Sequence, residues 1–203
     1  MLHIFEAKPV MNTLIRTFIA IKLPKNIISS MEKVMEGLKP PALKVKWVLP
    51  ENIHLTLKFL GNIDAGEINT IDEAIKNGVA GFSPIHLFVK GGGVFPDMRR
   101  PRVIWAGVAG ETDELIRLQE SIDTNLTKIG FSKDRRFKSH LTVGRVKGSI
   151  DPASLVDFIM SFGTFESKPF IVDKIFLIQS DLKPDGPIYT NLISIKLTDV
   201  LCS

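Results

Sequence analysis

The chain has 203 residues, of which 44% are hydrophobic and 24% charged, a composition that excludes an intrinsically disordered protein and fits one domain or two small lobes. Its 26 Lys and Arg against 22 Asp and Glu give a net charge of +4, which suits an anionic ligand but is far from polybasic. The one cysteine, Cys202, excludes an internal disulfide, and no cluster of Cys and His indicates a zinc site.

No stretch of the sequence approaches the 18 apolar residues that a membrane span needs. The N-terminus alternates charged and apolar residues and lacks the continuous apolar region of a signal peptide. We therefore expect a cytoplasmic protein without membrane association. Because Met11 begins a second plausible start, we assign residues 1–203 to a single domain in which 1–10 form a disordered extension.

Apolar alternation and helical periodicity predict the elements of the first half of the chain. In chain order these are strand 15–23, helix 25–38, strand 44–48, strand 53–60, helix 66–79 and strand 84–90. Pro24 ends the first strand, and Gly61 ends the strand at 53–60. The three glycines at 91–93 allow a bend or a bulge.

The second half continues with a similar mixture of strands and helices. In chain order these are strand 102–109, helix 112–129, strand 139–146, helix 152–162 and strands near 170–180 and 188–198. Gly130 ends the longest helix, and Asp151 followed by Pro152 begins the next. Because strands and helices do not alternate regularly, we predict an α+β fold with two mainly antiparallel sheets and helices on their outer faces.

The tripeptide His-Leu-Thr occurs twice, at His54 to Thr56 and at His140 to Thr142, each time inside a predicted strand. The spacing is too long for a solenoid repeat and suits two similar lobes that face one another. On a strand, the histidine and the threonine of each copy share one face, about 6.6 Å apart along the backbone. Two imidazoles and two hydroxyls would then converge between the lobes.

This grouping favours phosphodiester chemistry. Two imidazoles can act as general base and general acid near neutral pH, and threonine hydroxyls can donate hydrogen bonds to phosphoryl oxygens. A G-x-S-x-G nucleophile motif and a carboxylate cluster for magnesium are both absent from the sequence. We therefore predict hydrolysis without a metal or other cofactor. Of the remaining histidines, we interpret His3 as part of the N-terminal tail and His86 as a surface or core residue.

Residues 54–61 (HLTLKFLG) and 140–145 (HLTVGR) resemble the paired signatures of the two-histidine phosphoesterase superfamily, in particular the RNA 2′,3′-cyclic phosphodiesterases, historically called 2′-5′ RNA ligases. The resemblance covers most of residues 14–197. Further segments that match the family pattern are 16–24, 46–48, 95–96, 101–108, Ser180 and 186–189.

The resemblance implies a bilobal, pseudo-twofold fold in which both His-x-Thr strands form the floor of a central cleft. It also implies that a terminal ribose 2′,3′-cyclic phosphate is opened to a 2′-phosphate. His54 would be the proton donor to the departing 3′ oxygen, and His140 the proton acceptor that activates water. Since the two motifs are nearly symmetric, the reverse assignment stays open.

The resemblance further implies roles in substrate binding. Thr56 and Thr142 would hold the phosphate. Arg145 would neutralise phosphate charge or stack on a base. Phe18, on the opening strand, is a candidate platform for base stacking.

Simple alternation raises questions about two side chains, and the place of a third is also open. It places Arg145 on the face opposite His140, unless the strand twists or ends at Gly144. It places Lys58 on the His54 face, where the lysine would either add charge near the phosphate or be solvated. Tyr189 would either line the site or fill the interface between the lobes. Both tryptophans, Trp47 and Trp105, are interpreted as core residues.

Two basic segments, 133–138 and 99–102, modestly favour an anionic substrate. We therefore predict a monomer that acts on RNA ends bearing 2′,3′-cyclic phosphate, with tRNA halves among the candidates. One alternative is a 2′-5′ RNA ligase or 2′-5′ phosphodiesterase for tRNA-like or oligoadenylate substrates. Another is a non-catalytic RNA-binding module.

Overall fold

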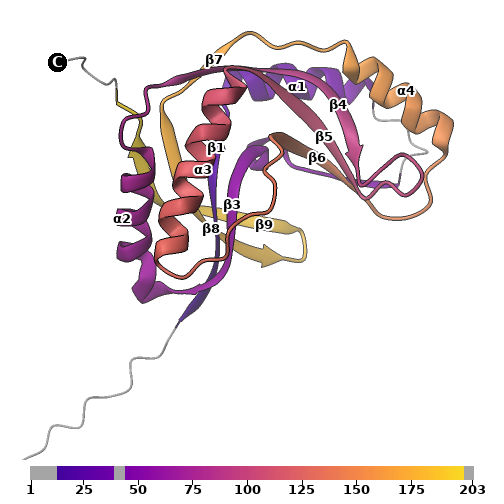
Figure 1. Cartoon of the computed structure of the whole chain (residues 1–203). Helices are drawn as coiled ribbons and strands as arrows, with labels where there is room; N and C mark the ends of the chain where they lie inside the picture. The colour runs from indigo at the N-terminus through magenta and orange to yellow at the C-terminus, as the bar shows by residue number, and fades with distance from the viewer. Residues whose placement is uncertain (1–12, 39–43, 199–203) are drawn as a thin grey trace, which may run out of the picture.

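The computed structural model describes residues 13–38 and 44–198 (Figure 1). The expected extension at 1–10 lies outside the described residues, as do His3, Met11 and Cys202. Within the described ranges, no helix is long and apolar enough to cross a membrane.

Nine strands form one sheet in the order β7-β4-β5-β6-β3-β1-β8-β9, and β2 pairs with β6 outside this path. All of the strand pairs are antiparallel. The strands are β1 (Leu14–Lys22), β2 (Val45–Trp47), β3 (His54–Asp64), β4 (Ile85–Phe95), β5 (Val103–Gly110), β6 (His140–Val146), β7 (Phe170–Val172), β8 (Lys174–Lys183) and β9 (Gly186–Lys196). With the helices, this arrangement confirms the predicted α+β fold.

The sheet consists of two half-sheets that meet between β3 and β6. These two strands are registered through the pair Leu55 and Leu141. On one side the order is β6-β5-β4-β7, and on the other it is β3-β1-β8-β9, so the halves correspond strand for strand about their junction. The two sheets expected from the sequence are thus the two halves of one continuous sheet.

Four α-helices in the described residues cover the sheet (Figure 1). They are α1 (Lys25–Leu38), α2 (Ile68–Val79), α3 (Thr112–Lys128) and α4 (Pro152–Gly163). Helix α1, from the first half of the chain, packs with α4, which contacts β4. Helix α3, from the second half, packs with α2 and contacts β3. Each of these helix pairs therefore combines one helix from the first half of the chain with one from the second.

The start of α4 and the packing of α2 and α3 follow from particular residues of the sequence. A carboxylate oxygen of Asp151 accepts a hydrogen bond from the Ser154 backbone N–H (2.9 Å), with Pro152 in the first turn of α4. The apolar stripe of α3, which includes Leu118 and Ile122, is fully buried. Gly78 allows α2 to approach α3, because a Cβ at this position would lie 2.7 Å from the Cα of Ile122.

Three predicted strands differ from the structure in length or continuity. Strand β3 does not end at Gly61 but continues to Asp64, because this glycine adopts a φ of +78° at a bulge against β1. Strand β4 likewise runs through a bulge at Gly91 to Phe95. The segment 170–180 divides at Asp173 into β7, which pairs with β4, and β8, which pairs with β1.

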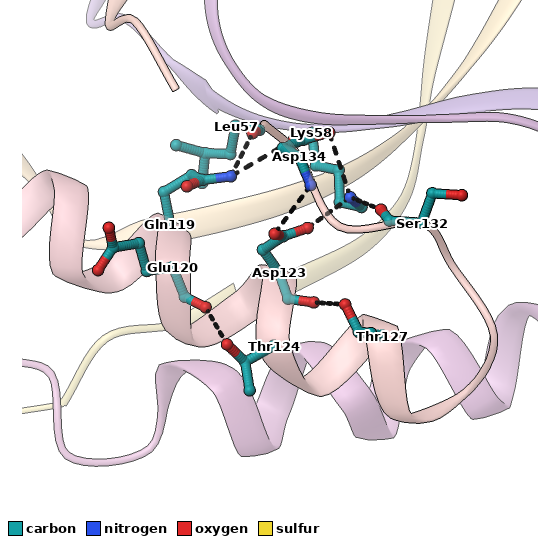
Figure 2. Close-up of polar contacts among 9 residues, drawn as sticks. All are labelled: Leu57, Lys58, Gln119, Glu120, Asp123, Thr124, Thr127, Ser132 and Asp134. Carbon is teal, nitrogen blue, oxygen red and sulfur yellow. Dashed lines mark hydrogen bonds and ion pairs between the residues drawn. The ribbon is translucent and has the colours of Figure 1, made fainter. Parts of the chain in front are cut away.

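A buried ion-pair network links β3, α3 and the segment that precedes β6 (Figure 2). The Lys58 ammonium group, on a side chain 2% exposed, donates to the Asp123 carboxylate (2.5 Å) and to the Ser132 carbonyl (2.7 Å). Asp134 lies 3.4 Å from the same ammonium group, and its backbone N–H donates to Asp123 (3.1 Å). Gln119, also buried, donates to the Leu57 carbonyl.

Replacement of Lys58 by methionine should destabilise the fold, because the Asp123 carboxylate would remain buried without its cation. We expect Lys58→Met to lower the free energy of unfolding by about 3–5 kcal/mol, measured by urea denaturation. Lys76→Met is the control, since it removes an exposed i,i+4 ion pair with Asp72 and should cost about 0.3–0.5 kcal/mol. Equal small losses in both variants would contradict the importance of the network.

Candidate active site

Each His-x-Thr strand contains a bulge at the residue directly after its threonine. In β3, Thr56 pairs with Ala20 while Lys58 pairs with Ile19, so Leu57 is the extra residue. In β6, Thr142 pairs with Trp105 while Gly144 pairs with Ile104, so Val143 is the extra residue. The bulges occupy corresponding positions in the two half-sheets and reverse the alternation of side chains beyond them.

This reversal corrects the prediction for Lys58. Its side chain does not share the face of His54 but lies in the core, paired with Asp123. The next residue, Phe59, occupies the histidine face instead and is 64% exposed. In β6 the same reversal brings the exposed Arg145 to the face of His140, so the strand neither twists away nor ends at Gly144.

Both histidine rings are held in the same way. The Nδ1 of His54 lies 2.7 Å from the carbonyl oxygen of Asn52, and the Nδ1 of His140 lies 2.7 Å from that of Lys138. Because a carbonyl oxygen only accepts hydrogen bonds, Nδ1 carries the proton in each ring. The other nitrogen, Nε2, is therefore the one that gains or loses a proton in both histidines.

His54 is packed among aromatic rings. Phe18 stacks on it with ring centroids 4.7 Å apart and an interplanar angle of 27°, and Tyr189 meets it edge-on at 5.3 Å. The Phe18 side chain is only 3% exposed. The expectation that Phe18 is an open platform for a base is therefore wrong, because His54 and neighbouring rings already cover it. Phe18 instead supports the imidazole.

The surroundings of His54 disfavour its charged form. Burial lowers the pKa of His54 below its usual value, the hydrogen bond to Asn52 opposes this, and the charges of Lys22, Arg145 and His140 add to the lowering. Lys22 pairs with His54 across β1 and β3, and its ammonium group donates to the Asn191 side chain (3.1 Å). Lys22 was not among the residues expected at the site, although it ends the strand that carries Phe18.

His140 lies against a different set of rings. Phe95 meets it edge-on at 5.0 Å and stacks on Trp105 at 5.3 Å. Trp105 is partly exposed and pairs with Thr142, so it lies beside the motif and is not simply a core residue. A Cβ on Gly93 would lie 2.5 Å from the indole ring, which explains the glycine there. Side chains alternate along β5, and Ile104 is buried. This alternation could have shown from the sequence that the neighbouring Trp105 points to the opposite face.

The two threonines and Tyr189 lie near these rings. Within residues 13–38 and 44–198, the hydroxyls of Thr56 and Thr142 have no hydrogen-bond partner, and both side chains are partly exposed. Burial raises the pKa of Tyr189, which keeps its hydroxyl protonated, although the charges of Arg145 and Arg16 oppose the shift. The structure thus places Tyr189 beside His54 and within reach of the charge of Arg145.

Asn52 is a positioning residue that the sequence did not reveal. Its backbone carbonyl accepts the hydrogen bond from His54, while its side-chain amide donates to the Pro187 carbonyl (3.1 Å). Pro187 lies at the start of β9, two residues before Tyr189. One buried asparagine therefore fixes both the imidazole and the strand that carries the tyrosine against it.

His86 does not join the other histidines. It is exposed on β4 and lies 3.2 Å from the Glu111 carboxylate. Among the described residues, no group of three or more His, Cys, Asp or Glu side chains is arranged to hold a metal ion. The arrangement available for chemistry is therefore two imidazoles with free Nε2 atoms, two free hydroxyls and the cations Lys22 and Arg145.

A family model described as LigT like Phosphoesterase matches residues 21–105 and 107–189. The RNA 2′,3′-cyclic phosphodiesterase of Methanothermobacter thermautotrophicus is 35% identical over 88% of this chain and 96% of its own length. The protein of that name from Archaeoglobus fulgidus is 38% identical over 87% of this chain and 97% of its own.

Solved structures agree with this similarity. A protein of Thermus thermophilus has a TM-score of 0.73 at 26% identity, over 90% of this chain and 97% of its own. Escherichia coli LigT in complex with 3′-AMP has a TM-score of 0.74 at 23% identity, over 92% of this chain and all of its own. The similarity to Escherichia coli LigT establishes the fold of this chain.

The lowered pKa of His54 predicts an acid-sensitive contribution to stability. Because the folded protein binds the His54 proton less tightly than the unfolded chain, this contribution is complete above the unfolded pKa of about 6.5 and is lost as the pH falls through the folded pKa. We expect the melting temperature of the wild type to fall more between pH 7 and pH 5 than that of His54→Gln. His86→Gln, at an exposed site, should follow the wild type. Parallel declines in wild type and His54→Gln would refute this.

Proposed function

Because the chain belongs to the LigT-like phosphoesterase family, we propose that it hydrolyses the terminal 2′,3′-cyclic phosphate of an RNA to a 2′-phosphate by paired-histidine acid and base catalysis. The observation that carries this proposal is the matched pair of His-x-Thr strands, joined at Leu55 and Leu141. Relatives at 35–38% identity that are named RNA 2′,3′-cyclic phosphodiesterase support the substrate class.

The reaction needs two proton transfers on opposite sides of phosphorus. Water attacks phosphorus in line with the bond to the ribose 3′ oxygen, which breaks, leaving a 2′-phosphate and a 3′ hydroxyl. We assign the proton of the attacking water to Nε2 of His140, and the proton delivered to the 3′ oxygen to Nε2 of His54. Because the histidines come from different half-sheets, the phosphate can lie between them.

The remaining groups of the site suit a phosphate anion. The free hydroxyls of Thr56 and Thr142 can donate to the two non-bridging oxygens. Arg145 and Lys22 supply positive charge on the same side, and both already act on His54. These contacts are all made to the phosphate, so we expect them to bind an RNA end whatever its terminal base.

The charge of the substrate also determines the protonation of His54. In the free protein, burial and the neighbouring cations favour its neutral form. A bound phosphate anion opposes these cations and raises the pKa of His54 again. Substrate binding is therefore accompanied by proton uptake at His54, which prepares this residue to act as the acid.

Ligation of 2′-5′ ends would use the same groups, because in-line phosphoryl transfer is reversible. Hydrolysis is the better supported direction, since Phe59 and Arg145 are exposed beside the motifs and water therefore reaches this face of the sheet. A non-catalytic RNA-binding module would not require two histidines that share the same tautomer.

The first test uses an oligoribonucleotide that ends in a 2′,3′-cyclic phosphate, with a chelator present. We expect His54→Ala and His140→Ala each to lower kcat by about 10²–10⁴-fold, because each removes one proton transfer. His86→Ala is the control and should retain wild-type activity, since this histidine lies apart from the motifs. A 3′-phosphate product, or full activity in either motif variant, would overturn the proposal.

The second test separates the acid from the base. A cyclic substrate with sulfur in place of the 3′ oxygen has a leaving group that needs no protonation, since a thiol is far more acidic than an alcohol. We expect this substrate to restore hydrolysis by His54→Ala but not by His140→Ala. Rescue of His140→Ala alone would reverse the two assignments.

A further inference from the structure

An open pocket lies beside His140 and takes no part in the catalytic steps proposed above. Its volume is about 570 Å³, and its lining residues are Phe95, Pro96, Asp97, Arg100, Arg102 and Val103. These residues come from the end of β4, the start of β5 and the connection between them. The pocket therefore occupies one end of the half-sheet that carries the second motif.

Two residues that line the pocket also contact or pair with residues of the second motif strand. The ring of Phe95 forms one wall and meets the His140 ring edge-on at 5.0 Å. Val103, at the other wall, pairs directly with Arg145 across β5 and β6. A substrate whose phosphate contacts His140 and Arg145 would thus have its next groups within reach of this pocket.

The pocket is positively charged. Arg100 and Arg102 are both exposed, and within residues 13–38 and 44–198 neither forms an ion pair. The ammonium group of Lys138 lies 5.5 Å from the centre of the Phe95 ring. One carboxylate, that of Asp97, also lines the pocket, but its Oδ1 accepts hydrogen bonds from the backbone N–H groups of Arg99 (2.8 Å) and Arg100 (3.1 Å).

The backbone that presents these cations is held in place on two sides. The N–H of Arg102 donates to the Phe95 carbonyl (2.7 Å), and its carbonyl accepts from the Val146 N–H (3.0 Å). Lys138 is fixed in turn, because its carbonyl accepts the hydrogen bond from His140. Arg102 and Lys138 therefore extend from backbone that is tied to the catalytic strand.

We propose that this pocket binds the backbone phosphates of the nucleotides that precede the cyclic phosphate, and that the preferred substrate is consequently a single-stranded RNA and not a cyclic mononucleotide. The inference rests on the function proposed above. Guanidinium groups bind phosphate oxygens without regard to the base, so the pocket selects a polynucleotide without selecting its sequence. The apolar wall of Phe95 suits the ribose or base of the adjoining nucleotide.

The test compares a 2′,3′-cyclic mononucleotide with a hexanucleotide that ends in the same cyclic nucleotide. We expect Arg100→Ala/Arg102→Ala to raise KM for the hexanucleotide by about tenfold per arginine, because each change removes a charge-assisted contact to phosphate. The KM and kcat for the mononucleotide should stay at wild-type values, which also shows that the variant is folded. The dependence of log KM on log salt for the hexanucleotide should weaken by about 1.4.

Arg117→Ala/Lys128→Ala is the matched control, because it removes two exposed cations from α3, away from the pocket. It should leave both substrates unaffected. If the wild type hydrolyses neither substrate, the proposed function fails. If it hydrolyses both, and the double arginine variant keeps the wild-type ratio of the two or the control variant loses as much, the assignment of the pocket is overturned.

Discussion

The site depends on the antiparallel pairing of two strands at Leu55 and Leu141. Both leucines point into the core and are 2% and 1% exposed, so their neighbours on either side must point to the opposite face. Antiparallel direction then sets His54 beside Thr142 and Thr56 beside His140. The burial of two apolar side chains therefore brings the four polar side chains of the motifs to one face of the sheet.

The two half-sheets share a backbone plan but carry different side chains at corresponding positions. Lys22 pairs with His54, whereas Gly107 pairs with His140. After the bulges, Phe59 in β3 corresponds to Arg145 in β6. The imidazoles are held identically through Nδ1 but experience different burial and charge. This difference, on a symmetric backbone, is consistent with the different roles that we propose for the two histidines.

Much of the fold could be predicted from the sequence because the helices and strands are amphipathic and their ends carry prolines and glycines. Alternation of side chains was less dependable at the site, because a bulge cannot be recognised from periodicity alone. Lys58 was therefore assigned to the wrong face. Phe18 was correctly placed on the opening strand, but its contact with His54 depends on strand pairing. The helical partners of each half-sheet also depend on tertiary packing, which no local pattern encodes.

The pairing of helices from opposite halves of the chain has a consequence for dissecting the protein. Helix α1 packs with α4 and α2 packs with α3, so each helix pair needs both halves of the chain. A fragment that ended between α2 and α3 would carry one His-x-Thr strand but would leave α1 and α2 without their partner helices. Separated halves would therefore have to associate with each other to restore both helix pairs.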